Sequence, residues 1–234
     1  HNLCSPAWNM ACDQWLLQNV KNFGCPILRT YGWDRPSLSL GYFQAYPASM
    51  PPHYAIVRRP TGGALVFHDF DLTFTVALPP DHPWRKLGVC ERYARVHERV
   101  SKVFERRGRE ARLAPCVSRI TNHASIPGAQ SSASSPDLCF AKSSRYDVVI
   151  DGAKVAGGAQ RVTRDGLIHQ GSIQGEREWR VSSQELKAAW ETCGADFEKF
   201  ILFPEQRSEI DELVVNPFGT QWWNQNGGRD WRSG

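Results

Sequence analysis

The sequence lacks the long apolar runs and clustered metal ligands that mark several common classes of protein. Its longest apolar runs have the length of strands, and no basic-then-apolar leader precedes them, so we predict neither a transmembrane helix nor a secretory signal. The seven cysteines form no C-x-x-C pair and the histidines do not cluster, which argues against a disulfide framework and a zinc site. A cytoplasmic location without membrane contact is the expectation.

An excess of charge of one sign is also missing. The chain has 28 basic and 24 acidic residues, and the resulting net charge of +4 is too mild to predict nucleic-acid binding. The hydrophobic fraction of 41% is typical of a globular protein that buries a sizeable core. Because the composition does not shift abruptly along the 234 residues, we expect one principal domain over residues 1–234.

Hydrophobic periodicity and turn residues predict the elements. We expect Asn9 to cap a helix that runs to Asn19, and Gly108 to end a helix over residues 90–107. The Asp151-Gly152 pair favours a tight hairpin turn. A Ser-rich stretch at about 118–137 is typical of a mobile loop, and a capping box of Ser182 and Glu185 opens a helical portion at about 180–234. Strands are predicted over residues 27–31, 37–40, 55–58, 65–67, 72–78, 145–150, 153–160 and 167–173.

A glycine-containing loop, residues 58–64, lies between two predicted strands. Its glycines can expose backbone N–H groups and let a ligand approach the main chain, and Arg58 and Arg59 could neutralise a phosphate or carboxylate. The loop is neither a Walker loop nor a dinucleotide fingerprint. Taken alone, an ordinary turn is the more common meaning of such a pair of glycines.

Two neighbouring strands carry further candidates. Lys154 lies among small residues in the predicted strand 153–160, along which a bulky ligand could lie, although a strand lysine is more often a solvated edge residue. In the next strand His169 stands two residues before Gly171, and a lone histidine is usually structural. Cys139, just before the hairpin, would be nucleophilic only as a thiolate, which a nearby ammonium would favour; the other reading is an inert thiol.

Together these segments resemble the biotin/lipoate protein ligase family. The resemblance extends in order from Asn9 to about Ile173, and its combination of motifs is highly specific. The segments that carry it are Asn9-Met10-Ala11-Cys12-Asp13, Leu38-Ser39-Leu40-Gly41-Tyr42-Phe43-Gln44, residues 58–69, residues 154–160 and His169-Gln170-Gly171-Ser172. The family commonly has three glycines where this chain has Gly62-Gly63-Ala64.

The resemblance implies an α/β fold with mixed or antiparallel sheets flanked by helices, related to the catalytic core of class II synthetases. It also implies that the glycine loop and the strand lysine surround a medium-chain acyl group. The residues expected to line that substrate site are Arg58, Arg59, Thr61, Gly62, Gly63, Ala64, His68, Gly157, Gly158, Ala159, His169 and Gly171.

The family contains two chemistries, ATP-dependent ligases and cysteine-dependent octanoyltransferases. Cys139 favours the transferase, because it precedes the lysine strand as in those enzymes. Ligases usually show Gly-Arg-Asn-Asp near this place, whereas residues 143–147 read Ser-Ser-Arg-Tyr-Asp. We also see no room after the hairpin for the accessory domain of many ligases.

The leading hypothesis is therefore an octanoyltransferase with Cys139 and Lys154 as catalytic residues. Cys139 would take octanoate from acyl carrier protein and pass it to a lysine of a lipoyl domain, such as that of glycine-cleavage H protein or a 2-oxoacid dehydrogenase subunit. Lys154 would keep Cys139 ionised, and backbone N–H groups would stabilise the oxyanion. No cofactor is expected.

Three alternatives stay open. An ATP-dependent lipoate or octanoate ligase would need ATP and Mg²⁺, with Arg59 binding phosphate and Lys154 contacting the adenylate. A transferase could instead move octanoate from the H protein to a dehydrogenase subunit. A non-catalytic module could retain only the acyl-binding pocket.

Overall fold

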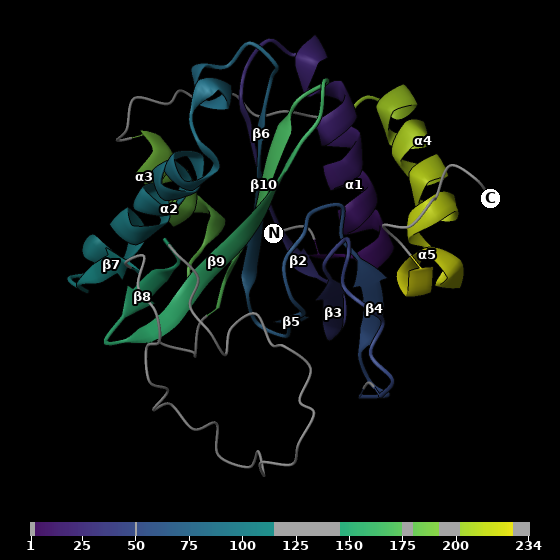
Figure 1. The fold of residues 1–234 in the computed structure, drawn as a ribbon, viewed down its shortest axis with the longest axis horizontal. Coiled ribbons are helices and arrows are strands. Elements are labelled where there is room, and N and C mark those ends of the chain that lie inside the picture. Colours follow the sequence, from purple (N-terminus) through teal and green to yellow (C-terminus); the bar gives the residue numbers. More distant parts are fainter. Residues whose placement is uncertain (1–2, 50, 115–145, 175–179, 192–201, 227–234) are drawn as a thin grey trace.

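The computed structural model describes residues 3–49, 51–114, 146–174, 180–191 and 202–226. Two sheets form the framework (Figure 1). The seven-stranded sheet contains, in spatial order, β1 (Leu3–Cys4), β2 (Ile27–Trp33), β6 (Leu72–Leu78), β10 (Leu167–Ile173), β9 (Ala153–Val162), β8 (Val148–Ile150) and β7 (Ala111–Leu113). The three-stranded sheet contains β4 (Ala55–Arg58), β3 (Ser37–Leu40) and β5 (Val66–His68). Each sheet has one parallel pair, β1–β2 and β3–β4, and is otherwise antiparallel, which confirms the expected mixed α/β class.

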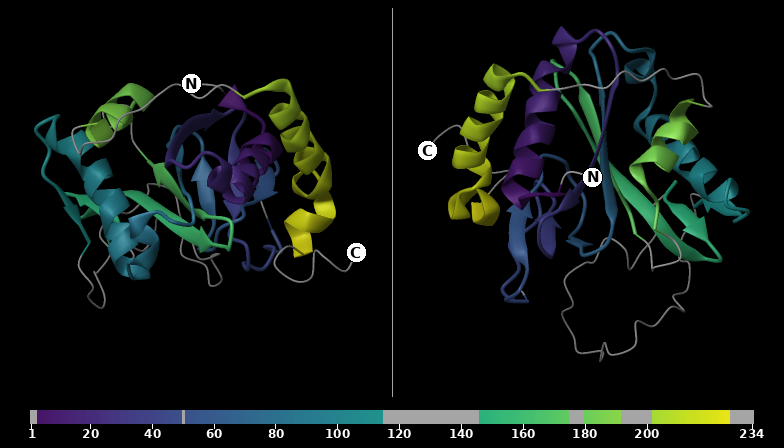
Figure 2. Two further views of the ribbon diagram at one scale, coloured as in Figure 1. Left: turned by 90° about the horizontal axis from the view of Figure 1, so that it is seen from above. Right: turned by 180° about the vertical axis from the view of Figure 1, so that it is seen from behind.

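Helices cover the large sheet in two groups, and α3 lies beside α2 while α4 lies beside α1 (Figures 1 and 2). The α-helices are α1 (Pro6–Asn19), α2 (Val89–Glu105), α3 (Ser183–Glu191), α4 (Pro204–Leu213) and α5 (Gln221–Asn226). Short turns of other helix types are η1 (Val20–Asn22), η2 (Pro83–Lys86) and η4 (Val214–Phe218). Across the residues described, none of these helices combines the length and hydrophobicity needed to cross a bilayer.

Alternation along β6 and β10 separates two buried clusters. Phe74 and Val76 of β6 join Leu167 of β10 in one cluster, while the next residue of each strand, Ala77 and Ile168, joins the other. Since successive strand residues point to opposite faces, the clusters lie on the two faces of the sheet. Helices α2 and α3 cover the first face and α1 covers the second, while α4 packs on α1 and α5 packs on β4 of the small sheet.

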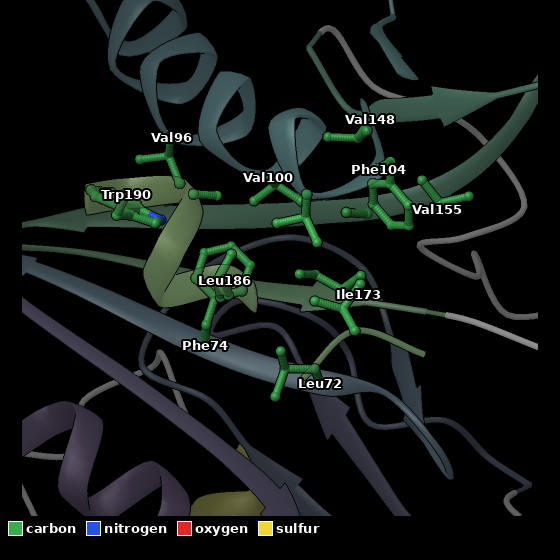
Figure 3. Close-up of a cluster of buried hydrophobic side chains, with 14 of the residues drawn as sticks. Leu72, Phe74, Val96, Val100, Phe104, Val148, Val155, Ile173, Leu186 and Trp190 are labelled. Atoms are coloured by element: carbon green, nitrogen blue, oxygen red, sulfur yellow. The ribbon is translucent and has the colours of Figure 1, made fainter. Parts of the chain in front are cut away.

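The apolar stripe of α2 packs in the core. Val96, Val100, Val103 and Phe104 are buried against the sheet, where Leu186 of α3 joins them (Figure 3). Complete burial of each such side chain contributes about 1.5–3 kcal/mol relative to exposure. The stripe therefore serves the core, not a ligand.

The first helix begins one turn earlier than predicted. Ser5, not Asn9, is its N-cap, because the Ser5 hydroxyl accepts from the N–H of Trp8 at 3.3 Å and Pro6 occupies the first helical turn. Asn9 lies buried within α1, where its amide donates to the Gly32 carbonyl at 3.0 Å and accepts from Arg29 at 2.7 Å. The prediction was wrong because Asn9 bonds to a distant strand and not to its own helix.

Several turn predictions are confirmed. Asp151 and Gly152 have φ values of 50° and 81°, as the hairpin turn requires. The Ser182 hydroxyl accepts from the N–H of Glu185 at 3.2 Å, while the Glu185 carboxylate accepts from the N–H of Ser182 at 2.9 Å, which completes the capping box of α3. The short strand β7 was not predicted. The Ser-rich stretch at 118–137 lies outside the described residues.

A buried carboxylate connects α1 to the large sheet. Asp13 accepts hydrogen bonds from Arg29 and Tyr31 of β2, Thr75 of β6 and Gln170 of β10, at 2.6–2.7 Å. Its side chain is fully buried. A carboxylate that is buried costs several kcal/mol unless such partners surround it, so the four donors and the helix fix one another's positions.

We predict that Asp13→Asn destabilises the fold strongly. The substituted amide replaces one acceptor oxygen with a donor that faces donors, which lowers the free energy of unfolding by about 3 kcal/mol. Urea unfolding measures the change. The control is Asp34→Asn, whose carboxylate pairs with the exposed Arg35 and contributes less than about 1 kcal/mol; equal losses in the two variants would contradict the assignment.

Candidate active site

A pocket lies between the α1-covered face of the large sheet and the small sheet. Its cavity volume is about 40 Å³. Met10, Tyr31, Trp33, Thr73, Gln170, Gly171 and Ser172 line it from α1, β2, β6 and β10, Gly157, Gly158 and Ala159 from β9, and Ser39, Arg59, Val66 and His68 from the small sheet and its loop. The wall is largely apolar or made of backbone, with a few polar groups.

Arg59 organises the glycine loop from inside. Its guanidinium donates to the carbonyls of Gly62 (2.7 Å), Ala64 (2.8 Å) and Ser39 (2.8 Å). Gly63 has a φ of 91°, which favours glycine. These carbonyls therefore turn toward Arg59, and the loop wraps around its side chain instead of leaving it extended toward solvent.

The loop is also fastened to its surroundings. Gly41 lies so close to it that an added Cβ would stand 1.8 Å from the Gly63 carbonyl oxygen. The Thr61 hydroxyl donates to the Gln170 amide oxygen at 2.6 Å, and Gln170 in turn donates to Asp13. The loop geometry thus depends on both sheets.

Arg58 does not line the pocket, contrary to the expectation from sequence. Its buried guanidinium donates to the carbonyls of Gly41 (2.7 Å), Gln44 (2.6 Å) and Asn224 (2.8 Å). Burial lowers the pKa of the group from its ordinary value. Arg58 therefore connects β4 to α5. No local pattern indicates this role, because its acceptor in α5, Asn224, lies more than a hundred residues away in the sequence.

Lys154 forms a buried ion pair beside the pocket. Its Nζ lies 2.8 Å from the Asp147 carboxylate, and the two side chains are only 4% and 1% exposed. The lysine side chain folds over Gly157, where an added Cβ would stand 2.7 Å from Nζ. Because Gly157 lines the pocket, a fixed positive charge lies directly behind its wall.

Tyr93 of α2 completes this side of the site. Its hydroxyl lies 2.7 Å from Asp147 Oδ1 and accepts from the Gly158 N–H at 2.7 Å. Neither Tyr93 nor Asp147 was assigned a role from sequence. A tyrosine on an otherwise apolar helix stripe gave the only signal.

His68 belongs to a polar cluster on the opposite wall. Its Nε2 lies 2.8 Å from the Ser39 hydroxyl and its Nδ1 lies 2.8 Å from Asp71, while its ring stacks on Trp33 at 4.0 Å. Burial alone would raise the pKa of Asp71, but His68, Ser172 and Thr73 hold that pKa below its ordinary value. The ionised carboxylate makes His68 Nδ1 the donor, which leaves Nε2 to accept from Ser39 when the ring is neutral.

His169 lies behind the pocket wall. It is fully buried, and its Nε2 would stand 2.3 Å from a Cβ added to Gly158. Its Nε2 lies 3.2 Å from Nε2 of His97, which is also fully buried. Burial lowers the pKa of His97 to about 4 and that of His169 well below its ordinary value, so both rings are neutral near pH 7.

The structure thus brings most of the candidate residues together. Six line the pocket: Arg59, His68, Gly157, Gly158, Ala159 and Gly171. Thr61, Gly62, Gly63, Ala64, Lys154 and His169 contact lining residues from behind. Cys139 lies outside the described residues. The described ranges contain no group of three His, Cys, Asp or Glu side chains arranged to hold a metal ion.

The sequence matches the lipoyl protein ligase A/B catalytic domain over residues 5–186, so the chain belongs to this family. Among curated proteins, it is 36% identical over 178 residues to the octanoyltransferase LipM of Bacillus subtilis, covering 72% of this chain and 61% of that protein. It is 35% identical over 176 residues to LipM of Kyrpidia tusciae, covering 72% and 62%. The matched region therefore spans about three-fifths of these relatives. The resemblance read from the motifs is confirmed.

Solved structures share the fold. Protein Ta0514 of T. acidophilum, solved with bound lipoic acid, superposes with a TM-score of 0.71 at 21% identity and covers 96% of this chain and 95% of that one. A lipoate-protein ligase A bound with ATP gives a TM-score of 0.70 at 21% identity, with coverage of 95% and 96%. At this identity the likeness concerns the fold alone.

We predict that Gly41→Ala disrupts the glycine loop. The new Cβ would overlap a backbone carbonyl that cannot move independently, which costs about 2–3 kcal/mol of unfolding free energy. Gly62→Ala is the matched control in the same loop, because a Cβ there meets nothing within 4 Å and stability should change by less than about 0.5 kcal/mol. Thermal or urea unfolding compares them, and a Gly41→Ala protein as stable as Gly62→Ala would refute the close approach.

Acid should destabilise the folded protein through His97. His97 takes up a proton near pH 6.5 in the unfolded chain but only near pH 4 in the folded protein. The stability that the neutral His97 contributes is therefore complete above pH 6.5 and is lost as the pH falls from 6.5 to 4. Between pH 7 and pH 5 the native protein should lose about 2 kcal/mol more than His97→Asn. Urea unfolding at both pH values tests this, and parallel losses would show that His97 is not held neutral.

Proposed function

We propose that the chain is an octanoyltransferase of protein lipoylation, which moves an octanoyl group through a Cys139 thioester onto a lysine of a lipoyl domain. The observation that carries the proposal is the buried Lys154 ammonium behind Gly157 at the edge of a largely apolar pocket. The likeness to LipM octanoyltransferases, at about 35% identity, supports the same choice.

The reaction would proceed in two acyl-transfer steps. The Cys139 thiolate attacks the octanoyl thioester of acyl carrier protein, and the carrier thiol leaves. The ε-amine of the acceptor lysine then attacks the enzyme thioester, an amide forms, and Cys139 regains its thiolate. The acceptor proton must leave with this second step. Neither step requires ATP.

Lys154 is the group best suited to stabilise charge in these steps. A thioester carbonyl at Gly157 would develop negative charge beside the Lys154 ammonium, and a nearby cation also favours a thiolate. The Gly158 N–H already donates to the Tyr93 hydroxyl, so an oxyanion would have to compete with that bond. The sequence led us to expect oxyanion donors among the backbone N–H groups of the glycine loop or of the lysine strand, and this contact concerns only the second of these.

The pocket wall suits an acyl tail. Met10, Trp33 and Val66 provide apolar surface, and the backbone of Gly157 and Gly158 permits close approach. The donor we propose is acyl carrier protein, and the acceptors are lipoyl domains of glycine-cleavage H protein or of 2-oxoacid dehydrogenase subunits.

ATP-dependent ligation is the second candidate, because a lipoate-protein ligase A bound with ATP has the same fold. In that reaction Arg59 would bind phosphate. Its guanidinium, however, already donates to the carbonyls of Ser39, Gly62 and Ala64. A phosphate would have to compete with these bonds, which favours the transferase.

Intact-protein mass spectrometry tests the choice. Incubation with octanoyl-acyl carrier protein and no ATP should give an octanoyl adduct that hydroxylamine removes, and Cys139→Ser should lower transfer to a lipoyl domain by at least about a thousandfold. Cys25→Ser is the matched control, because Cys25 is exposed and does not line the pocket.

Other outcomes identify the other functions. Full activity in Cys139→Ser would refute the thioester. Modification of the lipoyl domain only with octanoate, ATP and Mg²⁺ would identify a ligase. Binding of octanoate without any transfer would identify a non-catalytic module, and transfer only from octanoylated H protein would change the donor.

A further inference from the structure

A continuous chain of side-chain hydrogen bonds runs behind the pocket wall. Arg92 Nε lies 3.3 Å from the Gln160 amide oxygen, and the Gln160 amide nitrogen lies 3.1 Å from His169 Nδ1. His169 Nε2 lies 3.2 Å from His97 Nε2, and His97 Nδ1 lies 2.7 Å from the Tyr146 carbonyl oxygen. The chain thus joins β9, β10 and α2 to the residue that precedes Asp147.

The direction of every bond follows from its ends. The Tyr146 carbonyl can only accept, so His97 carries its hydrogen on Nδ1, and as a neutral ring it must accept at Nε2. His169 therefore donates from Nε2 and accepts at Nδ1 from the Gln160 amide nitrogen. Arg92, which can only donate, meets the Gln160 amide oxygen, in agreement with that amide orientation. One set of tautomers satisfies all four bonds.

The series of hydrogen bonds ends at Tyr146, whose backbone conformation needs support. Tyr146 has a φ of 67°, which a bulky residue rarely adopts without outside restraint. Its N–H donates to the Ala114 carbonyl at 2.9 Å, and its carbonyl accepts from His97. The two bonds hold both sides of the residue.

One face of α2 binds the consecutive residues Tyr146 and Asp147. Tyr93 and His97 are four positions apart and therefore lie on the same side of the helix. His97 binds the backbone of Tyr146, and Tyr93 binds the carboxylate of Asp147. Asp147 then pairs with Lys154.

We infer that His97 and His169 are positioning residues, which hold Asp147 against Lys154 and thereby fix the Lys154 ammonium behind Gly157. His97 acts through the Tyr146 carbonyl, and His169 acts by donating to His97. The positioning itself stands on the geometry alone. Only its effect on transfer rests on the function proposed above.

The tautomers give a direct test. In protein labelled with ¹⁵N-histidine at pH 7, long-range ¹⁵N–¹H NMR spectra should show His97 protonated on Nδ1 and His169 on Nε2, with both rings neutral. His97→Phe and His169→Phe assign the signals. The same tautomer in both rings, or a charged ring, would refute the proposed series of hydrogen bonds.

Chemical labelling tests the positioning. With a limiting amine-acetylating reagent, His97→Phe should raise acetylation of Lys154 relative to the exposed Lys21 by roughly tenfold, the factor expected from the loss of one buried hydrogen bond. His97→Asn should stay near the native ratio, because its amide nitrogen can replace Nδ1 as the donor to Tyr146. Val100→Ala is the control, since it destabilises the same helix without touching the chain of bonds.

The outcomes separate the inference from the function. An unchanged ratio in His97→Phe, or an equal rise in Val100→Ala, would overturn the positioning role. A rise in His97→Phe alone supports it even if the protein transfers no octanoate. If transfer occurs, His97→Phe should lower kcat more than it changes KM, and His97→Asn should restore most of kcat.

Discussion

The structure depends most on the buried Asp13 carboxylate, because a charge without water must be surrounded by donors. Its four donors come from three strands, so α1 can pack on the large sheet in one register only. Gln170, one of these donors, also binds Thr61 and so holds the glycine loop. A constraint in the helix–sheet contact thus extends to the wall of the pocket.

The opposite wall uses the same principle with different groups. Asp147 is buried between the Lys154 ammonium and the Tyr93 hydroxyl, and Tyr93 also binds Gly158, which lines the pocket. The pocket therefore lies between two polar systems whose donors and acceptors bind one another. Because these polar groups are already paired, few of them would lose hydrogen bonds to water if an apolar tail bound as proposed, and the charge would stay behind Gly157.

Local signals explain how much was predictable. Strands β3, β4 and β10 have the bounds read from the sequence, because turn residues delimit them and their apolar content is clear. The motifs also indicated six residues that line the pocket. The roles of Arg58, Asn9 and Asp147 could not be read, because each depends on partners distant in sequence or on burial that no local pattern encodes. The motif marks where the site is, whereas tertiary contacts decide which of two adjacent arginines faces it.

The transfer proposed above would explain the Lys154–Asp147 pair better than stability does. A buried ion pair rarely stabilises a fold more than apolar residues of similar volume would, because desolvation offsets the attraction. Here the pair is 4% and 1% exposed, and the additional bonds of Tyr93 and His97 hold its anionic partner in place. A fold gains little from such an arrangement, whereas a reaction that develops negative charge at Gly157 gains a cation that is already desolvated and oriented before the substrate arrives.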